Sequence, residues 1–532
     1  MNKVWIRLTL VIFSIILLPY IGNCQKAKTH VLTTDEAKLV KKDAATMFNT
    51  EDYSGALLSY KELIKNDPSN IDYNYKLGFC YLQTETNKKA ALPYLEIACK
   101  ASTAKKDWSY QLGLAKMYNE KWDEAIKAFS DFKELKFKLL KDQMPPDRLI
   151  EMCNNGKALA ANPVNVTFTN LGKAINTPYE EYNPFISANG KQLIFTSRRK
   201  GNIGGFIADL GIYTADIYTS MWKDTIWTKA KGAGGSVNTE WDEEAVGFSA
   251  TGDLVFIYFD NAEVFGDIGA SSLKGKMWQK PLMMPTNLNT KSLEGGATLS
   301  LDGTTLIFSS DVKGSIGGSD LYMIKKEKNG GWSAAENLGN TINTKFAEDF
   351  PNLSLDGKTL YFASKGWNSM GGFDIFRSEW DESLGKWGEC KNIGYPLNDV
   401  EDNNFISFTA DGQSAYISSV RTEGFGDKDI YKVEFLDTLH HPFHSYLSGM
   451  VSSTTGGKTE ITKVSIEEKE TGKSTTFAPN TTINNFVLPV VPGNYILRVE
   501  GYNFSNYSEE LTIEALFPPQ EIVHNIQVKT TK

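Results

Sequence analysis

The sequence predicts a multidomain α + β protein with a helical repeat stack, a five-bladed β-propeller closed by an N-terminal strand, and a C-terminal β-sandwich. Three observations predict this fold class. Small and aromatic residues recur every 34 or 35 residues within 31–160. A strand–turn–strand pattern recurs five times within 164–436, and residues 447–532 alternate between polar and apolar with a period of two. A chain of 532 residues has room for about two to four such domains.

The charge balance excludes one large class of function. The chain has 56 Lys and Arg against 64 Asp and Glu, which gives a formal net charge of −8. A nucleic-acid-binding protein needs a basic face for the phosphate backbone, so no nucleic-acid partner is expected. Aromatic residues make up 12% of the chain, which favours β-structure in part of it.

Residues 1–24 predict a signal peptide. Lys3 and Arg7 supply positive charge ahead of the apolar run "LTLVIFSIILL". The run is too short to span a bilayer comfortably. We therefore expect an exported chain that lies in the periplasm and is associated with the outer membrane.

The end of this segment allows two interpretations. Ile21-Gly22-Asn23-Cys24 resembles a bacterial lipobox, which implies that Cys24 is the lipidated first residue of a lipoprotein. Asn23 departs from the small residue that usually precedes the cysteine. Under the alternative, cleavage after Cys24 leaves Gln25 at the new terminus.

Four further cysteines, Cys80, Cys99, Cys153 and Cys390, are scattered without a C-x-x-C pair. A zinc site or redox motif is therefore not expected. Cys80 and Cys99 lie in neighbouring predicted helices, where an oxidising periplasm would permit a disulfide. The alternative is that all four are small buried apolar residues. No metal and no cofactor is expected.

Residues 31–160 predict three helix pairs followed by a capping helix. Three sets of residues keep the same spacing: Ala44, Gly78 and Gly113; Ala56, Ala90 and Ala125; and Tyr60, Tyr94 and Phe129. The small residues allow two helices to approach closely, and "YKLGFCY…AALPY" and "YQLGLAKMY…EAIKAF" resemble the tetratricopeptide repeat (TPR). Pro145 and Pro146 are placed to begin the capping helix. The resemblance implies a concave groove for a peptide or partner protein; a spacer without a ligand is the alternative.

Residues 164–436 repeat one hairpin five times. Its turn glycines are Gly190, Gly252, Gly303, Gly357 and Gly412. Asn-Gly, Thr-Gly or Asp-Gly between two alternating strands is a strong hairpin signal, because the turn needs positive φ. Four units continue into a third strand that begins Asp-aliphatic-aromatic, and a Trp-led fourth strand follows. Four strands in about fifty residues are typical of a propeller blade.

The two ends of this region predict how the blades close. The fifth unit stops at "DIYKVEF" and lacks a fourth strand. The stretch "VNVTFTNLGKAIN" precedes the first unit, and its "NLGKAIN" matches "NLGNTIN" of a later blade. We therefore expect the N-terminal strand to complete the fifth blade.

The repeats "LSLDGTTLIFSS" and "GGSDLY" resemble the WD40-like repeats of the TolB propeller. Some five-bladed propellers are glycosidases, which need paired carboxylates around the central channel. The candidates are Asp242, Glu243, Glu244, Glu294, Glu348, Asp349, Glu401 and Asp402. Because they recur in several blades, a role in positioning the blades is expected, and no catalytic residue is assigned.

Residues 437–446 predict a linker. His440, His441 and His444 stand on this Pro-containing segment, where a solvated linker is expected rather than a metal site. Residues 447–532 resemble the carboxypeptidase regulatory-like sandwich in Gly449-Met450-Val451, Pro492-Gly493-Asn494-Tyr495 and Gly501-Tyr502. That resemblance implies a non-catalytic accessory domain.

The combination resembles the periplasmic PorE-like family of Bacteroidetes, which belongs to the type IX secretion and gliding-motility apparatus. The resemblance implies a non-enzymatic scaffold whose partners are outer-membrane or periplasmic proteins of such a complex. Family members usually end in an OmpA-like domain that binds peptidoglycan. This sequence stops at Lys532 directly after the sandwich, so peptidoglycan binding is not expected. The alternative function is a carbohydrate-binding or glycan-cleaving propeller.

Overall fold

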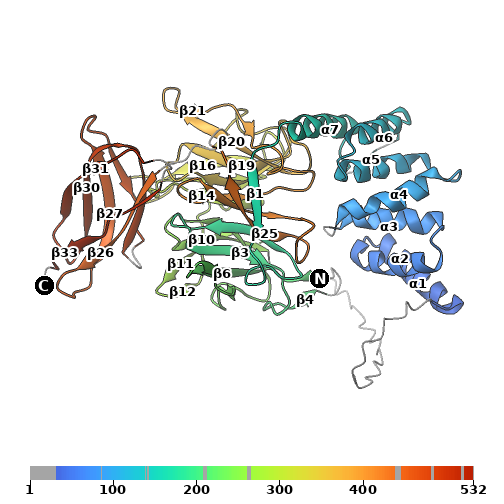
Figure 1. The fold of residues 1–532 in the computed structure, drawn as a ribbon, viewed down its shortest axis with the longest axis horizontal. Helices are drawn as coiled ribbons and strands as arrows, with labels where there is room; N and C mark the ends of the chain where they lie inside the picture. Colours follow the sequence, from blue (N-terminus) through green and yellow to red (C-terminus); the bar gives the residue numbers. More distant parts are fainter. Residues whose placement is uncertain are drawn as a thin grey trace, which may run out of the picture.

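The computed structural model describes residues 32–530, with gaps at 85–86, 138, 140–142, 208–211, 261–264, 438–444, 481–483 and 517–519. Figure 1 shows N-terminal helices, a central β-rich part and a C-terminal β-rich part, one after another along the longest axis. The predicted signal peptide, Cys24 and the histidines His440, His441 and His444 lie outside the described residues.

The N-terminal part consists of TPR-like helical repeats. Its helices are α1 (Thr34–Asn49), α2 (Tyr53–Asn66), α3 (Ile71–Gln83), α4 (Ala91–Lys100), α5 (Ser109–Tyr118), α6 (Trp122–Glu134) and α7 (Pro146–Ala160), with short 3₁₀ turns at Lys88–Ala90 and Lys106–Trp108. Each helix packs on the next. In the part of the chain that the structure describes, no helix is long and apolar enough to cross a bilayer.

Capping residues, glycine and proline explain where the helices begin and how closely they pack. Thr33 and Glu36 form a capping box at the start of α1, which satisfies backbone N–H groups that the helix leaves unpaired. A Cβ atom at Gly78 would lie 2.6 Å from Cγ of Leu95, so α3 and α4 come close only because this residue has no side chain. The helix predicted from Pro145 and Pro146 begins at Pro146.

One repeat differs from the expectation. Ala90 lies in the 3₁₀ turn Lys88–Ala90 rather than inside the second helix of its pair, which begins at Ala91. Pro93 stands in the first turn of α4, where its missing N–H costs little.

The central part contains five antiparallel sheets of four or five strands. The first has β2 (Glu181–Ile186), β3 (Gln192–Ser197), β6 (Asp216–Lys223), β7 (Ile226–Trp227) and β8 (Lys231–Gly232). The second has β9 (Asp242–Phe248), β10 (Leu254–Asp260), β11 (Phe265–Lys274), β12 (Met277–Trp278) and β13 (Leu282–Met283). The third has β14 (Glu294–Leu299), β15 (Thr305–Ser310), β16 (Asp320–Lys325) and β17 (Glu336–Asn337). The fourth has β18 (Glu348–Leu353), β19 (Thr359–Ser364), β20 (Asp374–Asp381), β21 (Lys386–Trp387) and β22 (Lys391–Asn392). The fifth has β23 (Ile406–Phe408), β24 (Ser414–Ser419), β25 (Asp429–Phe435) and, beside β25, β1 (Val166–Asn170). A two-stranded hairpin, β4 (Phe206–Ile207) and β5 (Ile212–Tyr213), stands apart from these sheets.

The N-terminal strand joins the last sheet as the sequence predicts. β1 runs antiparallel to β25, with Val166 opposite Phe435 and Asn170 opposite Tyr431. The first four sheets contact one another in order, and Tyr361 of the fourth packs on Phe408 of the fifth. The first sheet also contacts the fifth, where the ring centres of Phe185 and Phe405 lie 4.1 Å apart.

The fourth strand is short in the first four sheets, whereas β1, which completes the fifth, has five residues. In the first, second and fourth sheets it is divided into two pieces of two residues each. The tryptophans that lead these strands, Trp227, Trp278 and Trp387, are buried against the sheets. Each strand is therefore positioned by one packed indole more than by a hydrogen-bonded ladder.

The C-terminal part has two four-stranded sheets around one hydrophobic core. Its strands are β26 (Ser445–Ser453), β27 (Glu460–Glu468), β28 (Ser474–Phe477), β29 (Asn485–Val490), β30 (Gly493–Tyr502), β31 (Tyr507–Ile513), β32 (Glu521–Val523) and β33 (Ile526–Val528). Val464, Phe486, Leu488 and Leu497 are almost fully buried between the sheets.

The C-terminal part covers the end of the central sheets that carries the hairpin turns. The backbone N–H of Ala478 donates to the carbonyl of Leu301 at 3.0 Å, and Nδ2 of Asn480 donates to the carbonyl of Thr251 at 3.1 Å. Tyr446 and Val487 pack on Ala188. The C-terminal part therefore covers much of this end of the sheets, and the strand starts that carry the repeated acidic residues lie at the opposite end.

Candidate functional site

A buried glutamate stands at the start of the first strand in four of the five central sheets. These residues are Glu181, Glu243, Glu294 and Glu348, and each side chain is fully buried. Each accepts hydrogen bonds from the backbone N–H and the hydroxyl of the threonine four residues earlier. In Glu348 both contacts are 2.7 Å long, and Oγ of Ser364 donates a third bond at 2.6 Å.

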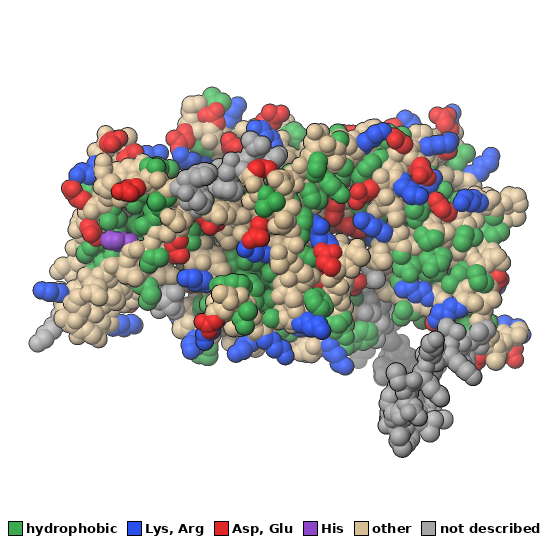
Figure 2. All heavy atoms as spheres, viewed as in Figure 1, with side chains coloured by type: hydrophobic (Ala, Val, Ile, Leu, Met, Phe, Trp, Pro, Cys, Tyr) green, Lys and Arg blue, Asp and Glu red, His purple; other side chains and the backbone are tan. Residues whose placement is uncertain are grey.

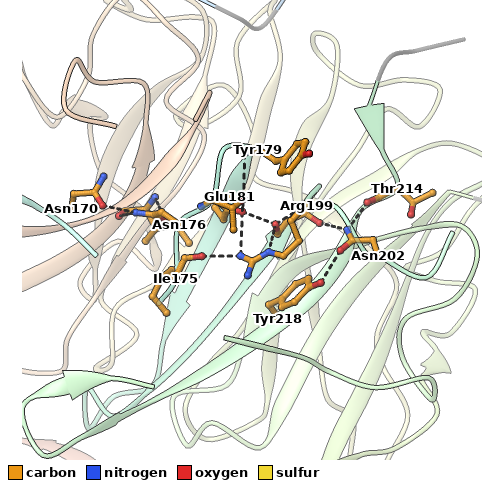
Figure 3. A network of polar contacts seen from close by, with 12 residues as sticks. Asn170, Ile175, Asn176, Tyr179, Glu181, Arg199, Asn202, Thr214 and Tyr218 are labelled. Carbon is orange, nitrogen blue, oxygen red and sulfur yellow. Dashed lines mark hydrogen bonds and ion pairs between the residues drawn. The ribbon is translucent and has the colours of Figure 1, made fainter. Parts of the chain in front are cut away.

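Figure 3 shows the version of this contact in the first sheet, where an arginine joins it. Nη2 of Arg199 lies 3.1 Å from Oε1 of Glu181 and donates to the carbonyl of Ile175 at 2.8 Å. The guanidinium lies over the ring of Tyr218, 4.1 Å from its centre. Burial raises the pKa of Glu181 despite these donors, because the carboxylate is removed from water.

The eight candidate carboxylates fall into groups according to what their side chains contact. Glu243, Glu294 and Glu348 each accept hydrogen bonds from the threonine that precedes their own strand. In the fifth sheet Asn403 takes the equivalent place and exchanges hydrogen bonds with Asp399. A neutral amide fills the same role there, so the position does not need a charge.

A second repeated contact, between an asparagine side chain and the backbone of a third strand, was not predicted from the sequence. The side-chain amides of Asn176, Asn238, Asn289, Asn343 and Asn398 each bond both the N–H and the C=O of one residue in a third strand. The only signal was the asparagine that ends "NLGKAIN" and "NLGNTIN". Asn176 makes this contact with Ile430, 254 residues away, and so ties the segment after β1 to β25.

The aspartate that begins the third strand also repeats. It is Asp216, Asp320, Asp374 or Asp429, and in each case Oδ2 accepts from a backbone N–H of the preceding loop. Asp374 is fully buried, and its Oδ1 has no hydrogen-bond partner among the described residues. Burial raises the pKa of Asp374 to about 8. The second sheet has Asp267 at this position. It is followed by Ile268 and Gly269, so this strand does not match the Asp-aliphatic-aromatic pattern of the other four.

Asp374 predicts a pH dependence of stability. The folded protein holds a proton on this carboxyl between the ordinary pKa of 3.8 and about 8, whereas the unfolded chain has lost it. The stabilising contribution is therefore complete below about pH 4 and is lost as the pH rises through about 8, by up to about 1.4 kcal/mol per pH unit. The Asp374→Asn variant is expected to show a flatter decline of unfolding temperature between pH 5 and 9.

The matched control is Asp302→Asn, since Asp302 is exposed in a hairpin turn where Asn-Gly is equally suitable. Calorimetry of both variants across this pH range makes the comparison. An unchanged slope in Asp374→Asn would show that this carboxyl is ionised throughout the range.

Two other carboxylates line a cavity of about 360 Å³ at the end of the central sheets opposite the C-terminal part. Glu244 and Asp349 contribute to its wall together with Tyr258. Burial raises the pKa of both carboxyls, and it raises the pKa of Tyr258 to about 12. The sequence placed Glu348 and Asp349 together as candidates. The structure separates them, because adjacent residues of a strand point to opposite sides.

The remaining acidic candidates bind neighbouring groups. Asp242 lies 3.3 Å from the guanidinium of Arg198. Glu401 lies 3.6 Å from Nζ of Lys88, which belongs to the helical part. Oδ1 of Asp402 accepts from the N–H of Phe373 at 2.7 Å.

A buried arginine joins the helical part to the central part. Arg148 of α7 is only 7% exposed. Its guanidinium donates to the carbonyls of Lys365, Gly366 and Trp367 at 2.7, 2.9 and 3.1 Å, and to Oγ of Ser369 at 2.8 Å. Trp367 adopts a φ of 43° within this segment. We call this contact the Arg148 clamp.

The four cysteines of the described residues are free thiols. Cys80 and Cys153 are buried, and burial raises the pKa of each thiol to about 12, which disfavours the reactive thiolate. Among the residues that the structure describes, no group of three or more His, Cys, Asp or Glu is placed to hold a metal ion.

Comparisons with known proteins give partial structural likenesses. No protein-family model matches the chain, and no curated protein matches it. The first TPR domain of human RPAP3 is 20% identical, with coverage of 24% of this chain and 93% of that one and a TM-score of 0.19. BT0996, in a complex with RGII, is 9% identical, with coverage of 53% and 95% and a TM-score of 0.34. Hydrazine synthase of Kuenenia stuttgartiensis is 14% identical, with coverage of 55% and 78% and a TM-score of 0.27. Likenesses this low assign the protein neither a family nor an activity.

Proposed function

We propose that the chain is an exported, non-enzymatic scaffold at the periplasmic face of the outer membrane, where it binds components of a secretion or gliding-motility complex of the type IX kind. The observation that supports this most is the Arg148 clamp. It holds the helical stack in a fixed position against the central sheets, so a partner bound by the stack has a defined place beside them. The proposed partners are periplasmic or outer-membrane proteins, and Cys24 is the proposed lipid anchor.

The proposal includes a finer architecture, in which the five central sheets are the blades of a β-propeller closed by β1. One residue from the first strand of each sheet supports this arrangement: Phe185, Phe248, Leu299, Leu353 and Phe408 line a single small cavity of about 100 Å³. Pro489 of the C-terminal part lines the same cavity. Under this architecture the cavity lies on the central axis and the C-terminal part covers one mouth.

The repeated glutamates support a non-enzymatic role. A general acid or base must reach a substrate, and Glu181, Glu243, Glu294 and Glu348 are fully buried among donors of their own sheets. They stabilise the strand starts instead.

A second candidate function, a glycan-binding or glycan-cleaving protein, is favoured by the cavity that Glu244 and Asp349 line. Glu244 and Asp349 face this cavity from the second and fourth sheets, with Gly295 of the third sheet between them. Burial raises the pKa of both, which is the property that a general acid requires at neutral pH.

One experiment tests both functions. The tagged full chain and its Glu244→Gln/Asp349→Asn variant are purified from their native membrane in mild detergent, and the partners and the state of Cys24 are identified by mass spectrometry. We expect both proteins to recover the same envelope partners, because the cavity carboxylates are not part of the scaffold. Recovery of the chain alone would contradict the scaffold role. Both purified proteins are also assayed for glycan hydrolysis. Hydrolysis by the parent chain that is absent in the double variant would establish the second function.

A further inference from the structure

We propose that the tips of two hairpins in the central part form a docking surface for an anionic lipid bilayer. The surface comprises residues 221–232 of the first sheet and residues 273–284 of the second, and we call it the rim patch. It lies in adjacent sheets, since β9 of the second sheet contacts β2, β3 and β6 of the first; β6 and β12 are labelled in Figure 1. This inference does not depend on the proposed scaffold role.

The rim patch exposes large apolar side chains, of which Ile226 and Met277 stand beside the hairpin turns and Leu282 lies farther along the strand. Leu282 is 76% exposed, Met277 is 71% exposed and Ile226 is 65% exposed. Met221, Trp222 and Met283 are exposed as well. An apolar group of this size is unusual on a soluble surface, and it marks an interaction site.

The backbone makes these side chains protrude. Asp224 and Thr225 adopt φ values of 48° and 71°, as in the tight turns that join two adjacent strands. Gly275 has a φ of 65° at the tip of the second hairpin. Ile226 and Met277 therefore stand beside the two turns, whereas Leu282 pairs with Ala270 farther along its sheet. Trp222 and Ile226 also line a cavity of about 680 Å³ on the side of the fifth sheet.

The charges of the rim patch are strongly one-sided. It contains six exposed lysines, Lys223, Lys229, Lys231, Lys274, Lys276 and Lys280, and a single acidic residue, Asp224. The patch thus carries a net charge of +5 in a chain whose net charge is −8. No ion pair joins these lysines to a carboxylate within the described residues. Figure 2 shows Lys and Arg side chains gathered along this lower edge of the central part.

The same hairpin in the fourth sheet shows that the fold does not require this composition. Residues 378–392 contain Glu379, Asp381, Glu382 and Glu389 against Lys386 and Lys391, a net charge of −2. Only Leu384 among the large apolar side chains there is strongly exposed. The equivalent hairpin of the third sheet, within 325–336, has no strongly exposed large apolar side chain. The rim patch is therefore a property of two sheets and not of the repeat.

An anionic bilayer satisfies both features at once. Lysine side chains contact lipid phosphates, and their attraction adds up over a polybasic surface. The apolar tips enter the boundary between headgroups and acyl chains, and a tryptophan such as Trp222 favours the same depth. An acidic protein would satisfy the lysines but would leave the exposed Leu282 and Met277 without an apolar environment.

Vesicle flotation tests the inference. The full chain is mixed with vesicles of phosphatidylcholine alone or with phosphatidylglycerol added. Two variants are compared with the parent: Lys223→Glu/Lys276→Glu/Lys280→Glu and Ile226→Ser/Met277→Ser/Leu282→Ser. Every protein has the same N-terminus, so binding by the apolar run of residues 8–18 adds equally to all of them. The matched control is Leu384→Ser/Lys386→Glu in the fourth sheet.

We expect the parent to bind anionic vesicles better than neutral ones and less tightly as salt is added. The lysine variant is expected to bind anionic vesicles at least about tenfold more weakly, and the apolar variant to lose affinity as well, while the control binds like the parent. Thermal unfolding checks that all remain folded. Equal binding by the parent and both variants, or equal loss in the fourth-sheet control, would overturn the inference. So would binding that ignores lipid charge.

Discussion

Replacing Arg148 with alanine is expected to release the helical stack from the central sheets. The guanidinium is almost fully buried and makes four hydrogen bonds to the segment between β19 and β20. It also lies over Phe346, 4.7 Å from the ring centre. Removing it takes one donor from each carbonyl: Lys365 and Gly366 keep a bond from Ser369, at 3.3 and 3.1 Å, and Trp367 loses the Arg148 bond. We expect a loss of about 3–5 kcal/mol from the free energy that holds the stack in place.

The loss is expected to be local, because the helices and the sheets have separate hydrophobic cores. Small-angle scattering should show a less compact particle, and limited proteolysis should cleave between α7 and β1. The matched control is Lys157→Ala. Lys157 lies in the same helix and binds Asp123 at 2.7 Å, but its side chain is 56% exposed, so a change below about 1 kcal/mol is expected. If Arg148→Ala keeps the scattering profile and protease resistance of that control, the clamp is not what joins the two parts.

The helical repeats were predictable from the sequence because their contacts are local and periodic. Gly113 approaches Phe129 so closely that a Cβ atom would lie 2.5 Å from the ring, and both residues belong to the recurring sets. The hairpins were predictable for a similar reason, since Gly190, Gly303 and the other turn glycines adopt the positive φ that the Asn-Gly and Asp-Gly pairs imply. A contact between residues less than about 50 positions apart, made again in each repeat, leaves a recurring pattern in the sequence.

Contacts that occur once, across a long separation, left no such pattern. Arg148 binds residues 217–221 positions away, and nothing near it in the sequence distinguishes it from an exposed helix residue. The carboxylates show a second limit. Glu348 and Asp349 are neighbours in sequence, yet one binds its own sheet and the other faces a cavity. The alternation of side chains along a strand predicts that the two point to opposite faces of the sheet. It does not say which of the two faces the cavity.

Replacing Asn176 with alanine is expected to open the central part where its two ends meet. Oδ1 of Asn176 accepts from the N–H of Ile430 at 2.9 Å, and Nδ2 donates to the carbonyl of Ile430 at 3.0 Å. Asn176 is 2% exposed, so alanine leaves the N–H of Ile430 unpaired in a buried place, while the carbonyl of Ile430 keeps a bond from the N–H of Leu171 at 3.2 Å. One unpaired buried group costs about 1–3 kcal/mol, and we expect a loss of that size.

Asn343→Ala provides a control with the same chemistry and a different topology. Asn343 is 1% exposed and makes the same pair of bonds to Leu321, but it is only 22 residues away in the same sheet. Both variants should lose similar stability in denaturant. Only Asn176→Ala should speed hydrogen exchange in β1 and β25, because those strands lie at opposite ends of the central part in sequence and Asn176 ties one to the other. Equal exchange in β1 for the two variants would mean that the pairing of Val166–Asn170 with β25 holds the ends together without the asparagine, and that the ends meet through the strand ladder alone.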